Sequence, residues 1–216
     1  MGEFPADIYT EPANLDFDTL RNLGPLRPMA GIWEGTKGLD LKPKAAGPKE
    51  QVYVERIELQ PIDTQTNGPQ LFYGLRYWTH IVKPNQIKTY HDQVGYWLWE
   101  PMTGTVIHSL TIPRAQAVLA AGKAEANAAS FEVSATRGAT DYGVCSTPFL
   151  EHAFRTDSFR IKVTINPDGT WSYFEDTVLI IPGVEKPFHH TDRNTLFRIA
   201  EPTPNPMARG QREETP

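Results

Sequence analysis

Six histidines are the residues of this sequence that are best suited to chemistry. They are His80, His91, His108, His152, His189 and His190. The chain has one cysteine, Cys145, which argues against a thiolate zinc site. It contains no glycine-rich phosphate loop, no Cys-x-x-Cys, no His-Glu-x-x-His and no Gly-x-Ser-x-Gly. Metal ligation or acid–base chemistry by an imidazole is therefore the chemistry to consider first.

The adjacent pair His189 and His190 begins a segment that reads as the last strand, residues 189–199. Side chains alternate between the two faces of a strand. If Arg198 points inward, its face also carries Leu196, Asn194, Asp192 and His190. A rise of about 3.3 Å per residue then places His190 roughly 26 Å from Arg198. His189 points the other way in a regular strand, but a bulge would exchange the two, so His189 is the second candidate.

A Gly-x-Trp segment indicates the structure that positions these residues. Residues 31–35 read GIWEG, so Trp33 can cap the floor of a closed antiparallel barrel, with Arg198 in cation–π contact across the indole. The first and last strands are then neighbours, and His190 lies near the opposite, open mouth. An inward imidazole above an apolar cavity suits a flat metallocofactor, with one ring nitrogen on iron and the other bonded to a carbonyl or carboxylate. Alternatively, His190 only forms hydrogen bonds in the mouth.

Strand-like segments follow one another after residue 31, with no interleaved helices. They cover residues 52–59, 71–83, 85–91, 94–100, 104–112, 115–121, 129–135, 148–155, 158–165, 170–181 and 189–199. This spacing indicates an all-β barrel or sandwich. Leucines within residues 15–30 predict one short amphipathic helix, which ends at Gly24 and covers one end of the barrel. Residues 36–50 and 136–147 are expected to be long loops.

Length and composition bound the class of protein. One domain is expected over residues 15–200, with flexible tails at residues 1–14 and 201–216. A net charge of −5 without a basic cluster argues against nucleic acid as a partner. No apolar stretch approaches the roughly 20 residues of a membrane span, and the start lacks a signal-peptide pattern. The single cysteine fits a reducing compartment, so a cytoplasmic location is expected, and a homodimer is left open.

Several segments occur in an order that resembles one family. They are residues 31–35 (GIWEG), 54–57 (VERI), 71–78 (LFYGLRYW), 91–97 (HDQVGYW) and the final histidine strand. This series resembles the nitrobindin family of heme-binding β-barrels, which are related to fatty-acid-binding proteins, over about residues 22–200. The resemblance implies a ten-stranded antiparallel up-and-down β-barrel, with a short N-terminal 3₁₀ or α segment that caps one end.

The resemblance also implies a cofactor and a chemistry. A b-type heme would lie at the mouth, with His190 carried over as the axial iron ligand and His189 as the fallback. The further candidate cofactor contacts are Trp33, Thr36, Arg76 and His91. Family members bind nitric oxide at ferrous iron, and in the ferric state they are described as isomerising peroxynitrite to nitrate. An enzyme of this type is a heme-dependent peroxynitrite isomerase, and it needs no catalytic side chain of its own.

The sequence departs from the family pattern near the expected mouth. Residues 36–43 (TKGLDLKP) replace closely spaced glycines and a Tyr-Pro, and residues 93–96 (QVGY) lack the family's acidic residue. Residues 136–147 look like an insertion. Such changes can reshape a pocket while the barrel is kept, because a fold does not determine a function.

Two other functions therefore remain as alternatives. The first is a heme-free intracellular carrier of a lipid or other small apolar molecule, with Arg76 or Asn194 as polar anchors. The second is an enzyme on the same barrel that uses Asp192 and a histidine for acid–base catalysis. The loop lysines Lys37 and Lys42 can either pair with heme propionates or be ordinary solvated charges.

Overall fold

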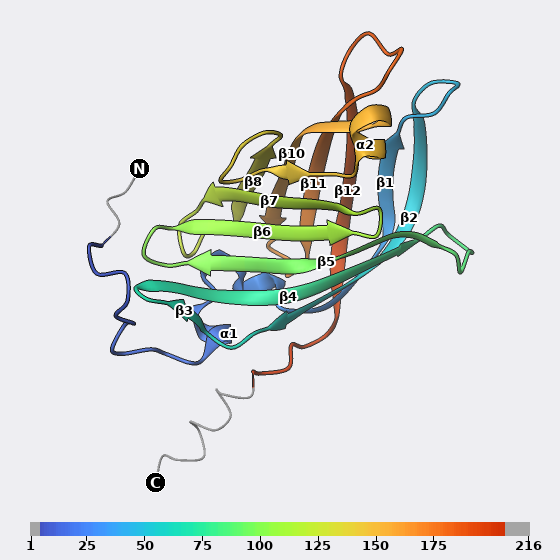
Figure 1. Cartoon of the computed structure of the whole chain (residues 1–216). Coiled ribbons are helices and arrows are strands. Elements are labelled where there is room, and N and C mark those ends of the chain that lie inside the picture. Colours follow the sequence, from blue (N-terminus) through green and yellow to red (C-terminus); the bar gives the residue numbers. More distant parts are fainter. Residues whose placement is uncertain (1–4, 206–216) are drawn as a thin grey trace.

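Ten long strands pair edge to edge into a closed antiparallel barrel in the computed structural model, which describes residues 5–205 (Figure 1). They are β1 (Gly31–Lys42), β2 (Lys49–Pro61), β4 (Gln70–Val82), β5 (Thr89–Glu100), β6 (Thr105–Ile112), β7 (Gln116–Lys123), β8 (Ser130–Thr136), β10 (Arg155–Ile165), β11 (Trp171–Ile180) and β12 (Phe188–Ala200). Strand β1 lies between β2 and β12, and the pairing of β2 with β4 closes the ring. The expected up-and-down barrel is thus confirmed.

The floor of the barrel is closed by two short helices, α1 (Thr19–Asn22) and the 3₁₀ helix η1 (Gly24–Met29). Sequence patterning predicted one helix here, but Gly24, the first residue of η1, has a φ of +54°, so α1 does not continue into η1. A Cβ at this position would meet the Trp99 ring at 2.5 Å, so only glycine fits. The capping element at this end is therefore confirmed, although it is divided.

Trp33 and Arg198 join the first and last strands at this floor. The two residues are directly paired across β1 and β12, and the Arg198 guanidinium lies 4.7 Å from the centre of the Trp33 ring system. The indole Nε1 of Trp33 donates a hydrogen bond to the Met29 carbonyl at 2.7 Å, and Arg198 donates to the Pro28 carbonyl at 3.0 Å. The expected cation–π contact is present, and it also fixes η1 onto the barrel.

The lower half of the barrel is filled by side chains rather than hollow. Trp33 packs edge-to-face against Trp171, with ring centres 6.1 Å apart, and Trp97 and Trp99 are also buried. The buried apolar side chains of α1 and η1 continue this core downward. Any chamber for a ligand inside the barrel is thereby restricted to the half that opens at the mouth.

Three expected elements are corrected by the structure. Residues 148–155 were expected to be a strand, but α2 (Pro148–Ala153) is a helix with proline in its first turn, where a missing N–H costs nothing. The strands expected at residues 85–91 and 94–100 are one strand, β5, which begins only at Thr89, so residues 85–88 belong to the preceding connection. Most of the expected loop 36–50 is strand, because β1 continues to Lys42 past a bulge.

That bulge changes which side chains face inward. Thr36 and Lys37 are consecutive exposed residues, and β1 shifts register by one residue against both of its neighbours there. Before the bulge odd-numbered positions such as Trp33 face inward, and after it the even-numbered Gly38 and Asp40 do. A bulge of this kind re-aims every later side chain of its strand.

Two short strands complete the sheet. Strand β3 (Gln65–Asn67) forms a hairpin with β4, and β9 (Val144–Cys145) pairs with β7. Strands β7 and β8 share one ladder pair, Ala121 with Ser134, so β9 occupies the edge of β7 where β8 has moved away. The expected loop 136–147 therefore contains a strand that belongs to the barrel wall.

Other expectations concern the ends of the chain and membranes. The tails proposed at residues 1–14 and 201–216 extend beyond residues 5–205 and so lie partly outside the described residues. Within the described part, no helix has both the length and the apolar character needed to cross a membrane.

Candidate functional site

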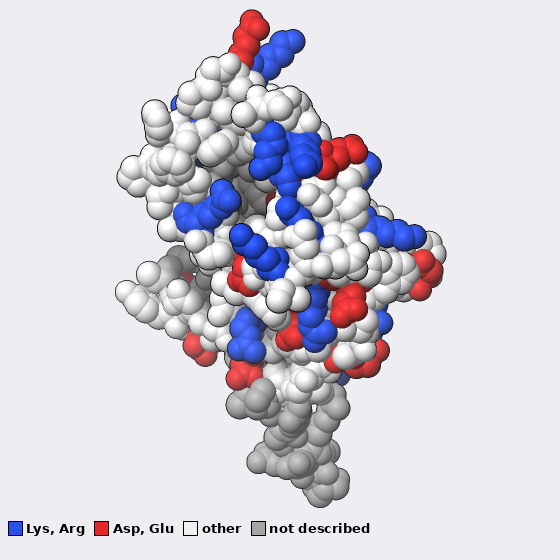
Figure 2. Space-filling view, turned by 90° about the vertical axis from the view of Figure 1, so that its right-hand side faces the viewer, with Lys and Arg blue, Asp and Glu red and all other residues white. Residues whose placement is uncertain are grey.

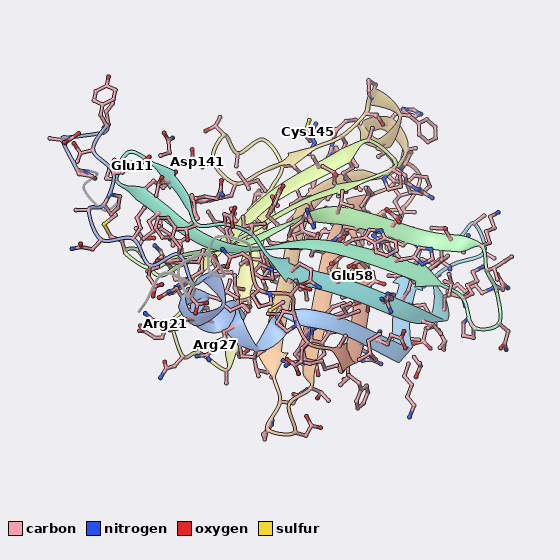
Figure 3. The ribbon with its side chains drawn as sticks, turned by 90° about the horizontal axis from the view of Figure 1, so that it is seen from below. Glu11, Arg21, Arg27, Glu58, Asp141 and Cys145 are labelled. Atoms are coloured by element: carbon pink, nitrogen blue, oxygen red, sulfur yellow. The ribbon has the colours of Figure 1, made fainter. Side chains whose placement is uncertain are left out.

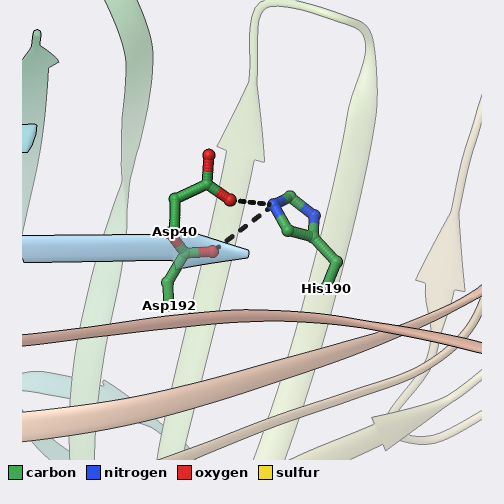
Figure 4. A group of neighbouring side chains, drawn as sticks. All are labelled: Asp40, His190 and Asp192. Carbon is green, nitrogen blue, oxygen red and sulfur yellow. Dashed lines mark hydrogen bonds and ion pairs between the residues drawn. The ribbon is translucent and has the colours of Figure 1, made fainter. Parts of the chain in front are cut away.

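His190 lies inward on β12, close to the open end of the barrel. Its Nε2 is 2.9 Å from Oδ1 of Asp40 and 3.6 Å from Oδ2 of Asp192 (Figure 4). Asp40 comes from β1 and is paired directly opposite Asp192, which lies two residues beyond His190 on the same face of β12. The side chain of His190 is 33% exposed and that of Asp40 only 4%. The imidazole thus borders the solvent, while its carboxylate partner is buried.

Asp40 is held by further groups of the mouth. The Tyr90 hydroxyl donates a hydrogen bond to its carboxylate, Lys42 donates to the same hydroxyl, and Lys42 Nζ lies 3.5 Å from Asp40 Oδ2. Burial alone would raise the pKa of Asp40, but the hydrogen bonds from His190 and Tyr90 and the nearby positive charges lower it below its usual value. These contacts therefore favour the charged form of Asp40 beside His190.

The same contact changes the protonation of His190. Burial would lower the pKa of this imidazole, but the hydrogen bond to Asp40 and the charges of Asp192 and Glu175 raise it above the ordinary value. Nε2–H is directed at Asp40, whereas Nδ1 has no hydrogen-bond partner among residues 5–205. One nitrogen of the ring is anchored and the other is available to a ligand.

Buried carboxyl groups lie below His190 in the barrel. Burial raises the pKa of Glu175 and of Asp192 and brings the pKa of Glu55 to about 7. Glu55 accepts hydrogen bonds from the Tyr173 hydroxyl at 2.9 Å and from Asn194 Nδ2 at 3.0 Å. The interior beneath the mouth is thus more polar than the apolar cavity that the sequence indicated.

A second polar chain runs down from His91 on β5. His91 Nε2 lies 3.1 Å from Gln93 Oε1, Gln93 donates to the Tyr77 hydroxyl at 2.6 Å, and that hydroxyl is 2.9 Å from His108 Nε2. His108 is buried and stacks on Trp97 at 3.8 Å, and burial lowers its pKa to about 3. His108 is therefore a neutral member of the core, and His91 is the second histidine near the mouth.

The remaining candidates are dispersed. His189 points outward and bonds to Asp176 on the outer face at 2.9 Å, because β11 and β12 pair without a bulge. Trp33 lies at the floor, and Thr36 is exposed in the bulge. Arg76 lies on the outer face of β4, between the inward-facing Leu75 and Tyr77. Of the six expected cofactor contacts, the structure brings only His91 and His190 together at the mouth.

The rim of the mouth carries positive charge. Figure 2, which looks from the right-hand side of Figure 1, shows lysine and arginine side chains gathered around a hollow. Lys42 Nζ and Lys83 Nζ lie 4.3 and 5.3 Å from the centre of the Tyr90 ring. The basic residues of the connections at this end include Lys44, Lys88, Arg114 and Lys186. An anionic group that enters the barrel meets these cations first.

Sequence reasoning did not single out Asp40, Tyr90 or Glu175. Simple alternation from Trp33 places Leu39 and Leu41 inward and Asp40 outward. The bulge reverses this alternation, so the inward orientation of Asp40 could not be predicted in this way. The signal that was available is the pairing of Trp33 with Arg198, which brings Asp40 opposite the final histidine strand once the extra residue is counted.

The arrangement can hold a metal through a histidine. Ligand atoms of Asp40, His190 and Asp192 all lie within 4.8 Å of one another. Metal-bound histidines usually donate their second ring N–H to a carboxylate, which fixes the ring and makes it a better ligand. His190, with one nitrogen on Asp40 and the other without a partner, has this form, so the residues fit an axial ligand to a heme iron.

Comparisons with known proteins agree with this fold. The model of a THAP4-like, heme-binding beta-barrel domain matches residues 22–198. The crystal structure of Rv2717c from M. tuberculosis superposes with a TM-score of 0.57, at 21% sequence identity over 83% of this chain and 96% of that one. At this identity the likeness establishes the fold alone. Among curated proteins, none matches the sequence.

Proposed function

Because this chain belongs to the family of THAP4-like, heme-binding β-barrel domains, we propose that it binds heme b at the mouth of its barrel, with His190 as the iron ligand. The observation that carries the proposal is the ring of His190, which is anchored through Nε2 by a buried carboxylate and whose Nδ1 has no hydrogen-bond partner within residues 5–205. The bound heme would supply an iron centre for nitric oxide binding and for isomerisation of peroxynitrite to nitrate.

Asp40 and His190 act together in this proposal. Ligation requires an imidazole with a free lone pair, so His190 must release one proton before it binds. With the other proton kept on Nε2 and directed at Asp40, Nδ1 keeps a lone pair for a ligand. Asp40 holds the ring in one orientation, while Lys42 and Tyr90 hold Asp40.

The cations of the rim have a separate role. Lys42 and Lys83 both lie over the Tyr90 ring at the mouth, where their charges can attract anionic propionate groups. His91 lies near enough to His190 that the two charges influence one another, and burial lowers its pKa. His91 is therefore neutral and can face a bound ligand without adding charge.

A carrier of apolar molecules inside the barrel has less support. Asp40, Glu55, Glu175 and Asp192 are carboxyl groups that face or underlie the mouth half of the interior. An apolar chain threaded through this region would remove water from these groups, at a cost of about 1–3 kcal/mol for each hydrogen bond that the protein does not replace.

A hemin titration followed at the Soret band tests the proposal. We expect a saturable one-to-one spectrum in the unmodified protein and in His189→Ala, and its loss in His190→Ala. His189 is the matched control because it is the adjacent imidazole, also bonded to an aspartate, but on the outer face. Far-UV circular dichroism confirms that each variant is folded.

Two results would overturn the assignment. Absence of saturable hemin binding to the unmodified protein would exclude the heme proposal for this chain. Equal spectra for His190→Ala and the unmodified protein would exclude His190 as the ligand. If the site forms as expected, the decay of peroxynitrite with and without the hemin-loaded protein measures whether the isomerase activity is present.

A further inference from the structure

A groove lies on the outside of the barrel, away from His190. It runs over the outer faces of β4, β5, β6 and β7, has a volume of about 810 Å³, and is bordered on one side by residues 139–145. Figure 3 labels Glu58 of β2 and, across the green strands, Asp141 and Cys145 of that bordering segment. Pockets of about 300–1,000 Å³ are the usual size for small-molecule sites.

The floor of the groove is aromatic and apolar. Its large outward-facing side chains are between 37% and 46% exposed, and they are Trp78, Val94, Tyr96 and Leu119. The indole Nε1 of Trp78 donates to Asp92 at 3.0 Å, and its ring stacks on His80 with an interplanar angle of 17°. The Trp78 ring is therefore held by contacts with Asp92 and His80, so a ligand would not have to order it.

The bordering segment is fixed by backbone bonds rather than by loose contacts. Leu119 N–H donates to the Gly143 carbonyl at 3.0 Å, and Thr136 N–H donates to the Tyr142 carbonyl at 3.3 Å. Cys145 pairs with Ala117 across the β7–β9 ladder. One side of the groove is thus built by the same segment that departs from the family pattern.

Arg76 is the one cation among the lining residues of the groove, which also include the carboxylates Glu58 and Asp141. Arg76 lies opposite the uncharged Gln60 on β2 and Tyr96 on β5, and its guanidinium forms neither an ion pair nor a hydrogen bond with any residue in 5–205. Glu58 is instead paired with Arg56, at 3.0 Å. A planar guanidinium beside aromatic rings suits a carboxylate with two acceptor oxygens.

We propose that this outer groove binds a flat apolar carboxylate. The ring lies against Trp78 and Tyr96, and the carboxylate accepts hydrogen bonds from Arg76. The site is separate from the mouth, since Arg76 and Trp78 point away from the interior that Tyr77 faces. Binding in the groove does not require heme, so the test of this proposal is independent of the test of the heme site.

Three naphthalene probes test the charge requirement. They share one ring system and carry a carboxylate (1-naphthoate), an amide (naphthalene-1-carboxamide) or an ammonium group (1-naphthylmethylamine). Binding is followed by amide shifts in ¹⁵N–¹H NMR spectra. We expect 1-naphthoate to bind at least tenfold more tightly than the other two, with shifts that map to the outer faces of β4, β5 and β7.

Two arginine variants localise the anion. Arg76→Gln should weaken 1-naphthoate binding at least tenfold and leave carboxamide binding unchanged. Arg193→Gln is the matched control, because Arg193 is an outward-facing arginine on the distant strand β12. Equal binding of the three probes, preference for the amine, or shifts centred on His190 and His91 would each overturn the proposal.

Cys145 provides a second readout. It is the one cysteine of the chain, it is exposed, and it lines the groove. Saturating 1-naphthoate should slow its alkylation by N-ethylmaleimide at least fivefold in the unmodified protein but not in Arg76→Gln. An alkylation rate that is unaffected by 1-naphthoate would show that the groove is not the binding site.

Discussion

Asp40 is a carboxylate in a place where carboxylates are costly, and its contacts explain why it is tolerated. A buried charge must be paired and hydrogen-bonded to avoid a desolvation penalty of several kcal/mol. His190, Tyr90 and Lys42 together meet this requirement. His189 and Asp176 form a similar pair on the outer face, but there the imidazole is 61% exposed. The two pairs are therefore a natural comparison between an interior and an exterior contact.

Asp40→Asn should reduce hemin affinity by about 10–100-fold, which is the usual effect of removing the carboxylate partner of a metal-bound histidine. The amide no longer fixes the charge or the tautomer of the His190 ring. Asp176→Asn is the control, because it changes the corresponding partner of His189 and should leave hemin affinity unchanged. Soret titrations of both variants give the comparison, and an equal loss in the two would contradict the assigned role of Asp40.

The buried carboxyl group of Glu55 should make the free energy of unfolding depend on pH. Its pKa is about 7 in the folded protein, against a reference value of 4.5. A raised folded-state pKa means that the protonated form is favoured by folding, so this contribution is complete below pH 4.5 and is lost as the pH rises through 7. The loss amounts to about 3 kcal/mol at full ionisation.

Glu55→Gln should remove this dependence, because glutamine can still accept hydrogen bonds from Tyr173 and Asn194 but does not ionise. Urea unfolding at pH 5 and pH 8 measures it, and the variant should gain up to about 3 kcal/mol on the unmodified protein at the higher pH. Glu58→Gln, at a half-buried position beside Arg56 on the outer face, is the control. Parallel pH profiles for Glu55→Gln and the unmodified protein would contradict the expectation.

At the scale of elements, the contact of Trp33 with Arg198 joins β1, β12 and η1. Arg198→Ala removes a cation–π contact and the hydrogen bond to the Pro28 carbonyl, so it should lower the free energy of unfolding by about 1–2 kcal/mol. Arg193→Ala, on the outer face of the same strand, should change it by less than about 0.5 kcal/mol. Urea unfolding measures both, and equal effects would show that the floor contact is not stabilising.

The strands could be predicted because their residues are β-branched and aromatic and alternate with turn signals. The Trp33 and Arg198 pair could be predicted from its chemistry and its place at the two ends of the chain. The sequence over residues 148–153 was misread, since the aromatic and leucine residues there resemble a strand and the significance of Pro148 at a helix start was not recognised. Local pattern could not resolve this, because tertiary context overrides propensity in short segments.

The candidate site was predictable only in part. The inward orientation of His190 followed from strict alternation along β12, which has no bulge against β11. Its partner Asp40 did not, because one extra residue at Thr36 and Lys37 reverses the alternation of β1 and no composition signal marks it. The carboxyl groups Glu55 and Glu175 were also missed, since acidic residues within strands read as solvent-facing positions.

At the scale of the whole molecule, the ring of strands is not uniform. Strands β7 and β8 share one ladder pair, whereas β1 and β2 pair along most of their length. Amides that lie in few and poorly shielded hydrogen bonds open at lower free energy. The seam between β7 and β8 should therefore be the place where the barrel opens first.

Hydrogen exchange, followed by mass spectrometry or NMR, tests whether the β7–β8 seam opens more readily than the other strand pairs. Amides of β8 that face β7 should exchange at least tenfold faster than amides in the middle of β1, which has a full partner on each side. Strand β10 supplies the internal control, because its pairing with β11 is long. Uniform protection around the ring would contradict a weak seam.

The separation of β8 from β7 also affects association between molecules. Where β8 leaves β7, the backbone N–H and C=O groups of β7 would form an open sheet edge, on which a strand of a second molecule could add. The two residues of β9 cover that edge beside Ala117 and Val118. Strand β9, which is not needed to close the ring, should therefore hinder the addition of a strand from a second molecule. A chain that lacks β9 should aggregate through the exposed edge of β7.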